Sequence, residues 1–286
     1  MSASRPRTRF VLGVVATFVA LWLVAPMFVV VPISFTGQAS FQFPPQGWSL
    51  RWYERFLTDP AWLRSLGNSV LIGLATAAIA TPLGTVAALA MHRSPGRIAR
   101  WAQALLLMPM VVPAIIAGAG VYTFFLRAKL VGSMPAFVLV HVCLALPLVV
   151  IPVNASLAGY DRTLELAAAS LGANRVRTFF EVTVPLIAPG LAAGAVFAFA
   201  TSFDEVIVSQ FMVGPSLQTL PIAMYSSVTR DTDPTIAAAA TLILAAVLLG
   251  FLVHRLAVGP LLARRGRGPA GPADGSARFE ADEELP

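Results

Sequence analysis

The chain has 286 residues, of which 57% are hydrophobic and only 12% are charged, and its formal net charge is +6. About a quarter of the residues of an ordinary soluble domain are charged, so this composition excludes a soluble globular domain and predicts an integral membrane protein. The one cysteine, Cys143, excludes a disulfide framework and a thiolate metal site. The three histidines, His92, His141 and His254, lie on separate segments, which favours helix packing over a shared metal site.

Six apolar runs predict the transmembrane helices. A bilayer core of about 30 Å needs about 20 apolar helical residues, and suitable runs lie at 10–33, 68–91, 101–126, 134–154, 186–212 and 235–258. Arg5, Arg7 and Arg9 resemble the basic start of a secretory signal, but the first run exceeds the usual signal length of about 7–15 apolar residues and no clear cleavage site follows it. We therefore predict a retained helix and an all-α membrane protein with six spans.

The arginine and lysine residues predict the orientation, because cytoplasmic loops are enriched in them. With the N-terminus inside, 14 of the 20 fall on the cytoplasmic side and 6 on the other side. Both termini are therefore expected in the cytoplasm, with an N-terminal tail at 1–9, a membrane domain at 10–263 and a disordered tail, rich in Gly, Pro and charge, at 264–286. This bias also explains the net positive charge, so no nucleic-acid partner is inferred.

The loop after the first span is expected outside. Leu50, Tyr53 and Leu57 recur at helical spacing, which indicates a short helix on the membrane surface with Trp48 and Trp52 at the level of the lipid headgroups. Asp-Pro pairs at 59–60 and 233–234 have the pattern of a helix N-cap followed by the first helical residue.

The fourth and fifth runs are joined by the segment 160–185, which contains the sequence LELAAASLGANRVRTFFEVTVP. Asp161 is a candidate N-cap for a helix with an apolar stripe at Leu164, Ala167, Ala168 and Leu171. Gly172 suits the residue that ends this helix, and Asn174 is a candidate N-cap for a second short helix over 175–182. The stripe must be covered either by this protein or by a partner, and the pattern alone leaves both open.

Two features stand out in the fifth run. The sequence GLAAG at 190–194 is a Gly-x-x-x-Gly step, which favours close helix packing within the chain over a dimer contact. Asp204 and Glu205 are the only adjacent acids in an apolar run, and Thr201, Glu205 and Ser209 recur at i+4. On a continuous helix these four residues form a polar stripe that could line a pathway for a di- or tri-cation. The alternative is that the acids reach the outer interface or pair with an arginine such as Arg127.

The loop at 160–185 resembles the EAA loop of the permease subunits of ABC importers. In that motif a glutamate and two alanines precede a glycine, two aliphatic residues and a proline at fixed spacing. The matching positions here are Ala167, Ala168, Gly172, Val182, Val184 and Pro185. Leu166 stands at the position of the motif's glutamate, and the acid is one residue earlier, at Glu165.

The resemblance implies that this loop is a coupling helix that docks in a groove of a separate ATPase subunit. The chain itself carries no P-loop, since its only lysine, Lys129, is not in a Gly-Lys-Ser/Thr sequence. We therefore expect no cofactor on this chain, with ATP and Mg²⁺ bound by the partner. The resemblance further implies two copies of the ATP-binding subunit, a second permease subunit that is a paralogue, a periplasmic or extracellular solute-binding protein, and a place in the inner membrane.

The resemblance is strongest to the spermidine/putrescine permease subunits, through GWSLRWYERFLTDP, SFDEVIVSQFMVGP and QTLPIAMYSSV. It implies a polyamine as the solute, with ferric iron importers as the related alternative. An ion-coupled secondary carrier is an alternative of another class, since broken helices and buried acids occur there too. An intramembrane enzyme is disfavoured because neither His-Glu-x-x-His nor Gly-x-Ser-x-Gly occurs.

Overall fold

The structure is a computed structural model that describes residues 6–94, 96–214, 217–230 and 233–265. Across these residues it is helical and has no strand, with one isolated β-bridge between Thr36 and Trp48. The elements are α1 Pro6–Ile33, α2 Arg51–Thr58, α3 Pro60–Arg93, α4 Arg97–Leu107, the 3₁₀ turn η1 Met108–Met110, α5 Ala114–Arg127, α6 Met134–Ala158, α7 Thr163–Ser170, α8 Arg175–Thr178, the π-helical turn η2 Phe179–Thr183, α9 Val184–Asp204, α10 Ile207–Met212, α11 Leu220–Arg230 and α12 Thr235–Arg265.

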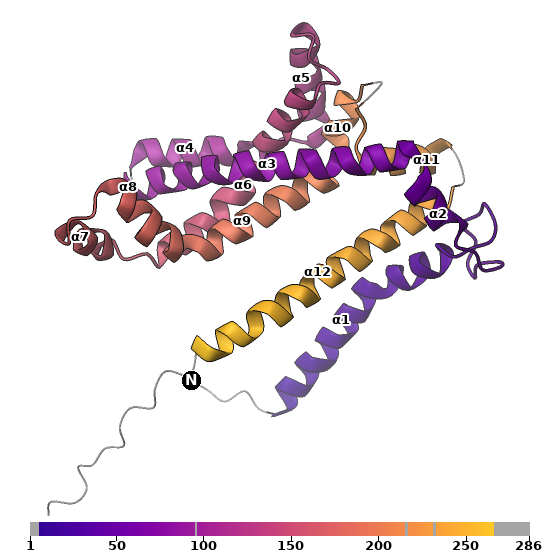
Figure 1. Cartoon of the computed structure of the whole chain (residues 1–286), viewed down its shortest axis with the longest axis horizontal. Helices are drawn as coiled ribbons and strands as arrows, with labels where there is room; N and C mark the ends of the chain where they lie inside the picture. Colours follow the sequence, from indigo (N-terminus) through magenta and orange to yellow (C-terminus); the bar gives the residue numbers. More distant parts are fainter. Residues whose placement is uncertain (1–5, 95, 215–216, 231–232, 266–286) are drawn as a thin grey trace, which may run out of the picture.

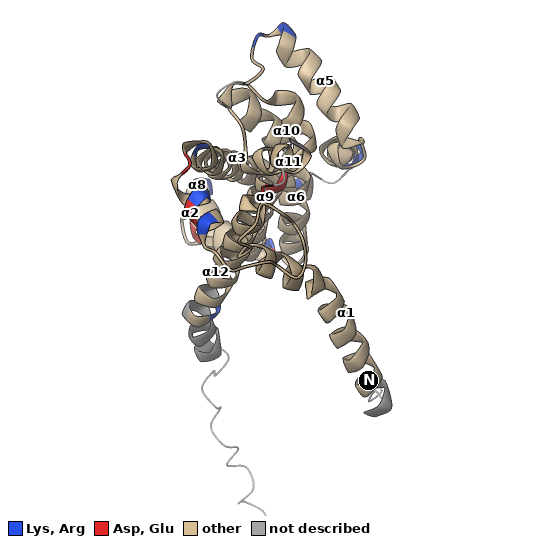
Figure 2. Ribbon diagram, turned by 90° about the vertical axis from the view of Figure 1, so that its right-hand side faces the viewer, with Lys and Arg blue, Asp and Glu red and all other residues tan. Residues whose placement is uncertain are grey.

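Among the described helices, five are long and apolar enough to cross a membrane, or six if the bent pair α4–α5 is one span. The ribbon segments of charged residues lie mainly at the ends of these helices and in α2 and α8, whereas the long helices are free of charged residues over most of their described length (Figure 2). The loop that holds α7 and α8 lies at one end of the molecule, and α2 and α11 lie at the other (Figure 1). The predicted tail at 264–286 lies almost wholly outside the described residues.

The third predicted span, at 101–126, is sharply bent. The chain bends by 98° between the helical segments Arg97–Met110 and Ala114–Arg127. Pro109 and Pro113 lie at this bend and each lacks a backbone N–H donor, and Pro113 leaves helical geometry with a ψ of 130°. α5 consequently projects sideways from the bundle, where it packs against α10 (Figure 1).

The fifth span is also interrupted, contrary to the prediction of one helix over 186–212. α9 ends at Asp204, Glu205 has an extended backbone with ψ of 120°, and α10 begins at Ile207. Helix geometry therefore does not carry through the polar residues of this run.

The core of the bundle is formed by α3, α6 and α9. Small residues let these helices approach closely: Ala80, Ala145 and Ala198 are fully buried in one cluster with Val149 of α6. Gly190 and Gly194 of α9 both face α6, where Cβ atoms would lie 2.6 Å from the Pro152 carbonyl oxygen and 3.3 Å from the Val149 Cα. The GLAAG step therefore serves packing within the chain, as predicted.

This close approach predicts a selective effect of alanine. Gly190→Ala is expected to lower the free energy of unfolding by about 1–3 kcal/mol, because the added methyl group meets the α6 backbone, which cannot give way. The matched control is Gly67→Ala on α3, where an added Cβ has no neighbour within 4 Å. That control is expected to raise stability by about 0.5–1 kcal/mol. Thermal unfolding in detergent measures both, and equal stability of the two variants would contradict the packing described for α9.

The loop between α1 and α3 is held by specific contacts. Trp52 is buried and its ring N–H donates to the Thr36 carbonyl at 2.8 Å, so it packs inside the folded loop, whereas Trp48 is exposed. The buried face of α2 is formed by Trp52 and Phe56, and Leu50 and Leu57 are exposed. An indole N–H needs a partner when it leaves water, and the folded loop supplies one.

Both predicted aspartate caps are present. Asp59 accepts a hydrogen bond from the Ala61 N–H at 2.7 Å at the start of α3. Asp233 accepts from the Thr235 N–H at 2.9 Å at the start of α12 and also lies 3.5 Å from an Arg55 nitrogen. This ion pair joins α2 to the last span.

Candidate functional site

The loop between α6 and α9 begins with the predicted cap. The Asp161 carboxylate accepts a hydrogen bond from the Thr163 N–H at 2.9 Å at the first turn of α7. This backbone bond is also the main reason why the pKa of Asp161 lies below its ordinary value. The start of α7 is therefore fixed by a local interaction that the sequence alone specifies.

The turn after α7 depends on Gly172, which has a φ of 85°. The N–H groups of Gly172 and Ala173 donate to the carbonyls of Ala169 and Ala168 at 2.9 and 3.0 Å. This pair of bonds is the Schellman motif, in which a left-handed residue after the helix satisfies its last carbonyls. Glycine adopts that conformation without strain, as the sequence predicts for this position.

The second half of the loop differs from the predicted separate helix at 175–182. Asn174 does cap α8, since its side chain accepts from the Arg177 N–H at 2.8 Å. α8 then passes through the π-helical turn η2 directly into α9, so Arg175–Asp204 forms one helical segment of 30 residues. The second half of the loop is thus the extended end of the fifth span.

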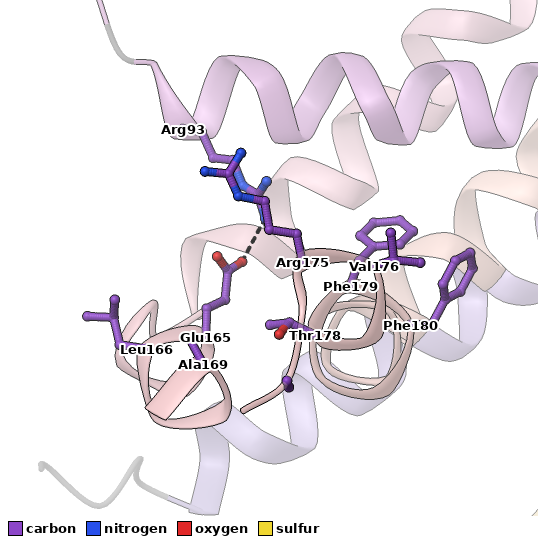
Figure 3. Close-up of a pocket in the computed structure, with 10 residues that line it drawn as sticks. Arg93, Glu165, Leu166, Ala169, Arg175, Val176, Thr178, Phe179 and Phe180 are labelled. Carbon is purple, nitrogen blue, oxygen red and sulfur yellow. Dashed lines mark hydrogen bonds and ion pairs between the residues drawn. The ribbon is translucent and has the colours of Figure 1, made fainter. Parts of the chain in front are cut away.

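Glu165 faces its own chain rather than away from it. Its carboxylate accepts hydrogen bonds from Arg93 Nη2 at 2.9 Å, from the Tyr160 hydroxyl at 2.7 Å and from the Thr183 hydroxyl at 3.3 Å. We call these four residues the Glu165 clasp, and Figure 3 shows its ion pair between Arg93 and Glu165. The clasp joins α7 to the end of α3, to the residue beyond α6 and to the turn before α9.

The clasp keeps the Glu165 carboxylate ionised. Partial burial would raise its pKa, but the hydrogen bonds from Tyr160 and Arg93 and the charge of Arg93 outweigh burial and hold the pKa below its ordinary value. A carboxyl group with a lowered pKa stabilises the fold at a pH above its unfolded pKa, and this contribution is lost as the pH falls through the folded pKa. The clasp is therefore intact at neutral pH.

The opposite face of the loop is apolar and open. Leu171 is 89% exposed and Leu166 is 68% exposed, and Leu164, Val176 and Phe180 are also exposed. Leu166 points away from the ion pair of Glu165 and Arg93 (Figure 3). Both this ion pair and the exposed apolar side chains Leu166, Val176 and Phe180 line a hollow of about 480 Å³. The apolar stripe that could have been buried within the chain is thus left uncovered by the described residues.

The second predicted site lies at the break between α9 and α10. Glu205 accepts hydrogen bonds from the N–H groups of Val208 and Ser209 at 2.8 and 2.7 Å, and so caps α10. Asp204 is exposed at the end of α9, Thr201 is half-buried one turn earlier and Ser209 is buried. The predicted stripe on a single helix face is therefore wrong, because the helix ends between Asp204 and Ser209.

A buried polar cluster surrounds this break. The His141 side chain is 1% exposed, and its Nδ1 and Nε2 lie 2.7 Å from the Ser202 hydroxyl and 2.9 Å from the Ser209 hydroxyl. Ser202 in turn donates to the Thr76 hydroxyl at 3.3 Å. The cluster thus links α3, α6, α9 and α10.

Comparison with known proteins identifies the family. The family model described as "Binding-protein-dependent transport system inner membrane component" matches residues 80–259, which include the loop, the Glu165 clasp and the break in the fifth span. The chain belongs to this family of inner-membrane permeases. It is thus a multi-pass inner-membrane protein and a transport subunit.

Named relatives of the permease are polyamine transporters. It is 35% identical over 245 residues to the putrescine transport system permease protein PotI of Escherichia coli K12, which covers 82% of this chain and 86% of the relative. It is 28% identical over 248 residues to the spermidine/putrescine transport system permease protein PotC of the same organism, covering 87% and 94%. In fold it resembles a bacterial ABC transporter involved in the import of the acidic polysaccharide alginate, with a TM-score of 0.61, 16% identity, and coverage of 92% of this chain and 99% of that chain.

The structure adds residues that the sequence analysis of the permease did not select. Arg93 and Tyr160 complete the Glu165 clasp, although they lie 72 and 5 residues away from Glu165. His141 was interpreted only as a packing residue. The available signal was the presence of hydroxyl residues inside otherwise apolar runs, at Thr76, Ser202 and Ser209.

Proposed function

We propose that this permease couples ATP hydrolysis on partner subunits to the import of a polyamine by alternating access. The observation that carries the proposal is the loop at 160–185, whose apolar side is uncovered and whose charged side is tied to the ends of three spans. An uncovered apolar stripe beside a basic helix, with Arg175 and Arg177, fits a groove on another protein. A movement imposed on such a loop reaches the spans through the clasp and through α9.

The partner in this proposal is a pair of ATP-binding subunits that hold ATP and Mg²⁺, and the permease contributes Glu165, Ala167, Ala168, Gly172, Val182 and Pro185 to the coupling loop. Glu165 contributes by bonding to its own chain through the clasp. Leu166, which stands at the position of the motif's acid, points away from the ion pair of Glu165 and Arg93. A second permease subunit, a paralogue of this chain, and an external solute-binding protein complete the assembly.

The proposed orientation has both termini in the cytoplasm. It is supported by the arginine and lysine bias and by the position of α7 and α8 at the end of the molecule opposite α2 and α11 (Figure 1). This orientation places the coupling loop where ATP is available. Protease protection of tags at the two termini in sealed inverted vesicles tests it, and protection of either tag would contradict it.

The proposed solute is putrescine or spermidine. The names of the relatives support it, and so do the two acids at the break of the fifth span, because carboxylates attract a di- or tri-cation in a medium of low dielectric constant. The pathway residues in this proposal are Thr201, Asp204, Glu205 and Ser209. Ferric iron import and an ion-coupled secondary carrier are the alternatives.

Reconstitution with the ATPase subunits, the paralogous permease and the binding protein tests the function. We expect putrescine or spermidine, delivered by the binding protein, to stimulate ATP hydrolysis and to enter proteoliposomes only with ATP. Uptake driven by an ion gradient without ATP would favour the secondary carrier. If ferric iron stimulates ATP hydrolysis and polyamines do not, the solute is ferric iron and the polyamine proposal is wrong.

Asp204→Asn is the sharper test of the pathway, because Glu205 also caps α10 and its replacement would disturb the break itself. We expect the variant to raise the half-saturating polyamine concentration about tenfold, equivalent to about 1.4 kcal/mol, near the lower end for a charge-assisted hydrogen bond. Initial uptake rates over a concentration series measure this change. The control is Glu54→Gln, which removes an exposed acid of α2. An unchanged half-saturating concentration in a normally assembled Asp204→Asn complex would exclude Asp204 from the pathway.

A further inference from the structure

The break in the fifth span is bridged by one side chain. α9 ends at Asp204 and α10 begins at Ile207, so no helical backbone continuity holds the two segments in line. His141 of α6 reaches Ser202 before the break through Nδ1 and Ser209 after it through Nε2. It lies in the buried part of the bundle, where hydrogen bonds are not weakened by competing water.

The direction of the hydrogen bonds follows from the chain of donors. Ser202 uses its proton to donate to the Thr76 hydroxyl, so it accepts from His141 and the proton of the ring lies on Nδ1. Nε2 is then the acceptor of a neutral imidazole and receives the Ser209 proton. Both ring nitrogens of His141 and the hydroxyls of Ser202, Ser209 and Thr76 are hydrogen-bonded within this cluster, so these bonds are all made only when α9 and α10 keep their present relation.

α10 is otherwise held by contacts that do not involve α9. Its end is bonded through the Met212 carbonyl to the Gly132 N–H at 3.1 Å, in the turn between α5 and α6, and Phe211 packs against Gly118 of α5. Val208 and Met212 are buried among apolar residues of α3, α5 and α6, and such contacts resist separation more than sliding. The bond from His141 to Ser209 therefore adds a directional link from α6 to the start of α10, at the end of the segment opposite the Gly132–Met212 bond.

We propose that His141 is a positioning residue that keeps α10 and the Glu205 carboxylate in register with α9, so that movement of the coupling loop reaches the pathway. This inference rests on the proposed function for its transport consequence. The role of His141 in holding α10 in position relative to α9 does not depend on which solute is transported.

Two substitutions separate the two bonds. The amide of asparagine reaches about as far as Nδ1, so His141→Asn can keep the bond to Ser202 and loses the bond to Ser209. The amide of glutamine reaches about as far as Nε2, so His141→Gln can keep the bond to Ser209. Each variant loses one of the two hydrogen bonds of His141. If His141 only stabilises the fold, the two variants should have equal effects on structure and transport. If His141 positions α10, His141→Asn should have the larger effect.

The structural readout is the distance between two spin labels on either side of the break. Labels are attached at Val196→Cys on α9 and Gln210→Cys on α10, both exposed positions, with Cys143→Ser removing the only native cysteine. We expect the distance distribution to broaden in His141→Asn and in the milder variant Ser209→Ala, and to stay narrow in His141→Gln and Ser202→Ala. Equal distributions in all four variants would overturn the proposal.

The functional readout is polyamine uptake per ATP hydrolysed by the reconstituted complex. We expect a loss of about five- to tenfold in His141→Asn and Ser209→Ala, the factor that corresponds to one net hydrogen bond of about 1–1.4 kcal/mol, and less than about twofold in His141→Gln. Equal uptake per ATP in the asparagine and glutamine variants would overturn the positioning role. If the unsubstituted complex imports no polyamine, the proposed function fails, and the spin-label distances still decide the role of His141.

Discussion

Leu171→Glu is expected to prevent the permease from assembling with its ATPase subunits. Leu171 directly follows α7 and is 89% exposed, so the substitution should change the stability of the fold by less than about 0.5 kcal/mol. In the proposed complex the same side chain enters an apolar groove, where a carboxylate without a partner loses its hydration. A central residue of this kind contributes about 2 kcal/mol or more to binding, so affinity for the ATPase should fall at least thirtyfold.

Co-purification and titration of the purified ATPase subunit measure this loss. Leu50→Glu is the matched control, since Leu50 is 65% exposed beside α2 at the other end of the molecule. It carries the same change of charge and should bind the ATPase normally. If Leu171→Glu keeps normal affinity while expressing well, the exposed stripe is not the ATPase contact.

Glu165→Gln is expected to leave assembly intact and to reduce the transport obtained per ATP. The exposed stripe is unchanged in this variant, but the amide loses the charge that pairs with Arg93 and can no longer accept all three hydrogen bonds of the clasp. Coupling free energies between sites are typically about 1–3 kcal/mol, so uptake per ATP should fall by about 5- to 150-fold. The ratio of uptake to ATP hydrolysis in proteoliposomes measures this.

The loop provides a matched control for the Glu165 prediction. Glu181→Gln also removes an arginine–carboxylate bond of 2.9 Å, to Arg177, but that pair is exposed and lies within a single helix turn. Exposed pairs contribute about 0–1 kcal/mol, so Glu181→Gln should change coupling by less than about fivefold. Arg93→Gln should reproduce the Glu165→Gln effect, and the double variant should be no worse than either alone. Additive losses would show that the two residues act separately.

Local features of the sequence predicted local features of the structure. The aspartate caps at 59, 161 and 233, the Asn174 cap and the turn at Gly172 were all assigned correctly, because each depends on residues within a few positions of one another. The position of the apolar runs also gave the long helices, since the bilayer thickness sets their length. The Gly190–Gly194 step was rightly assigned to packing within the chain.

The sequence did not locate the interruptions of the helices inside two apolar runs. A polar stripe at 201–209 assumed a continuous helix, but Glu205 bonds to the start of α10 and the helix ends. The third run bends by 98° at Pro109 and Pro113, although Pro82 and Pro147 lie within uninterrupted helices. The presence of a proline does not by itself show whether a helix continues or is interrupted, because neighbouring helices determine whether the freed carbonyls find hydrogen-bond donors.

The sequence by itself determined that this protein is a helical membrane protein of the permease family, because hydropathy and motif spacing are properties of the chain read in order. Only the tertiary structure decided which way Glu165 faces and what His141 joins. Arg93 lies 72 residues before Glu165, and Ser202 and Ser209 lie 61 and 68 residues after His141. These residues meet because α3, α6 and α9 pack together, and no local pattern encodes that proximity.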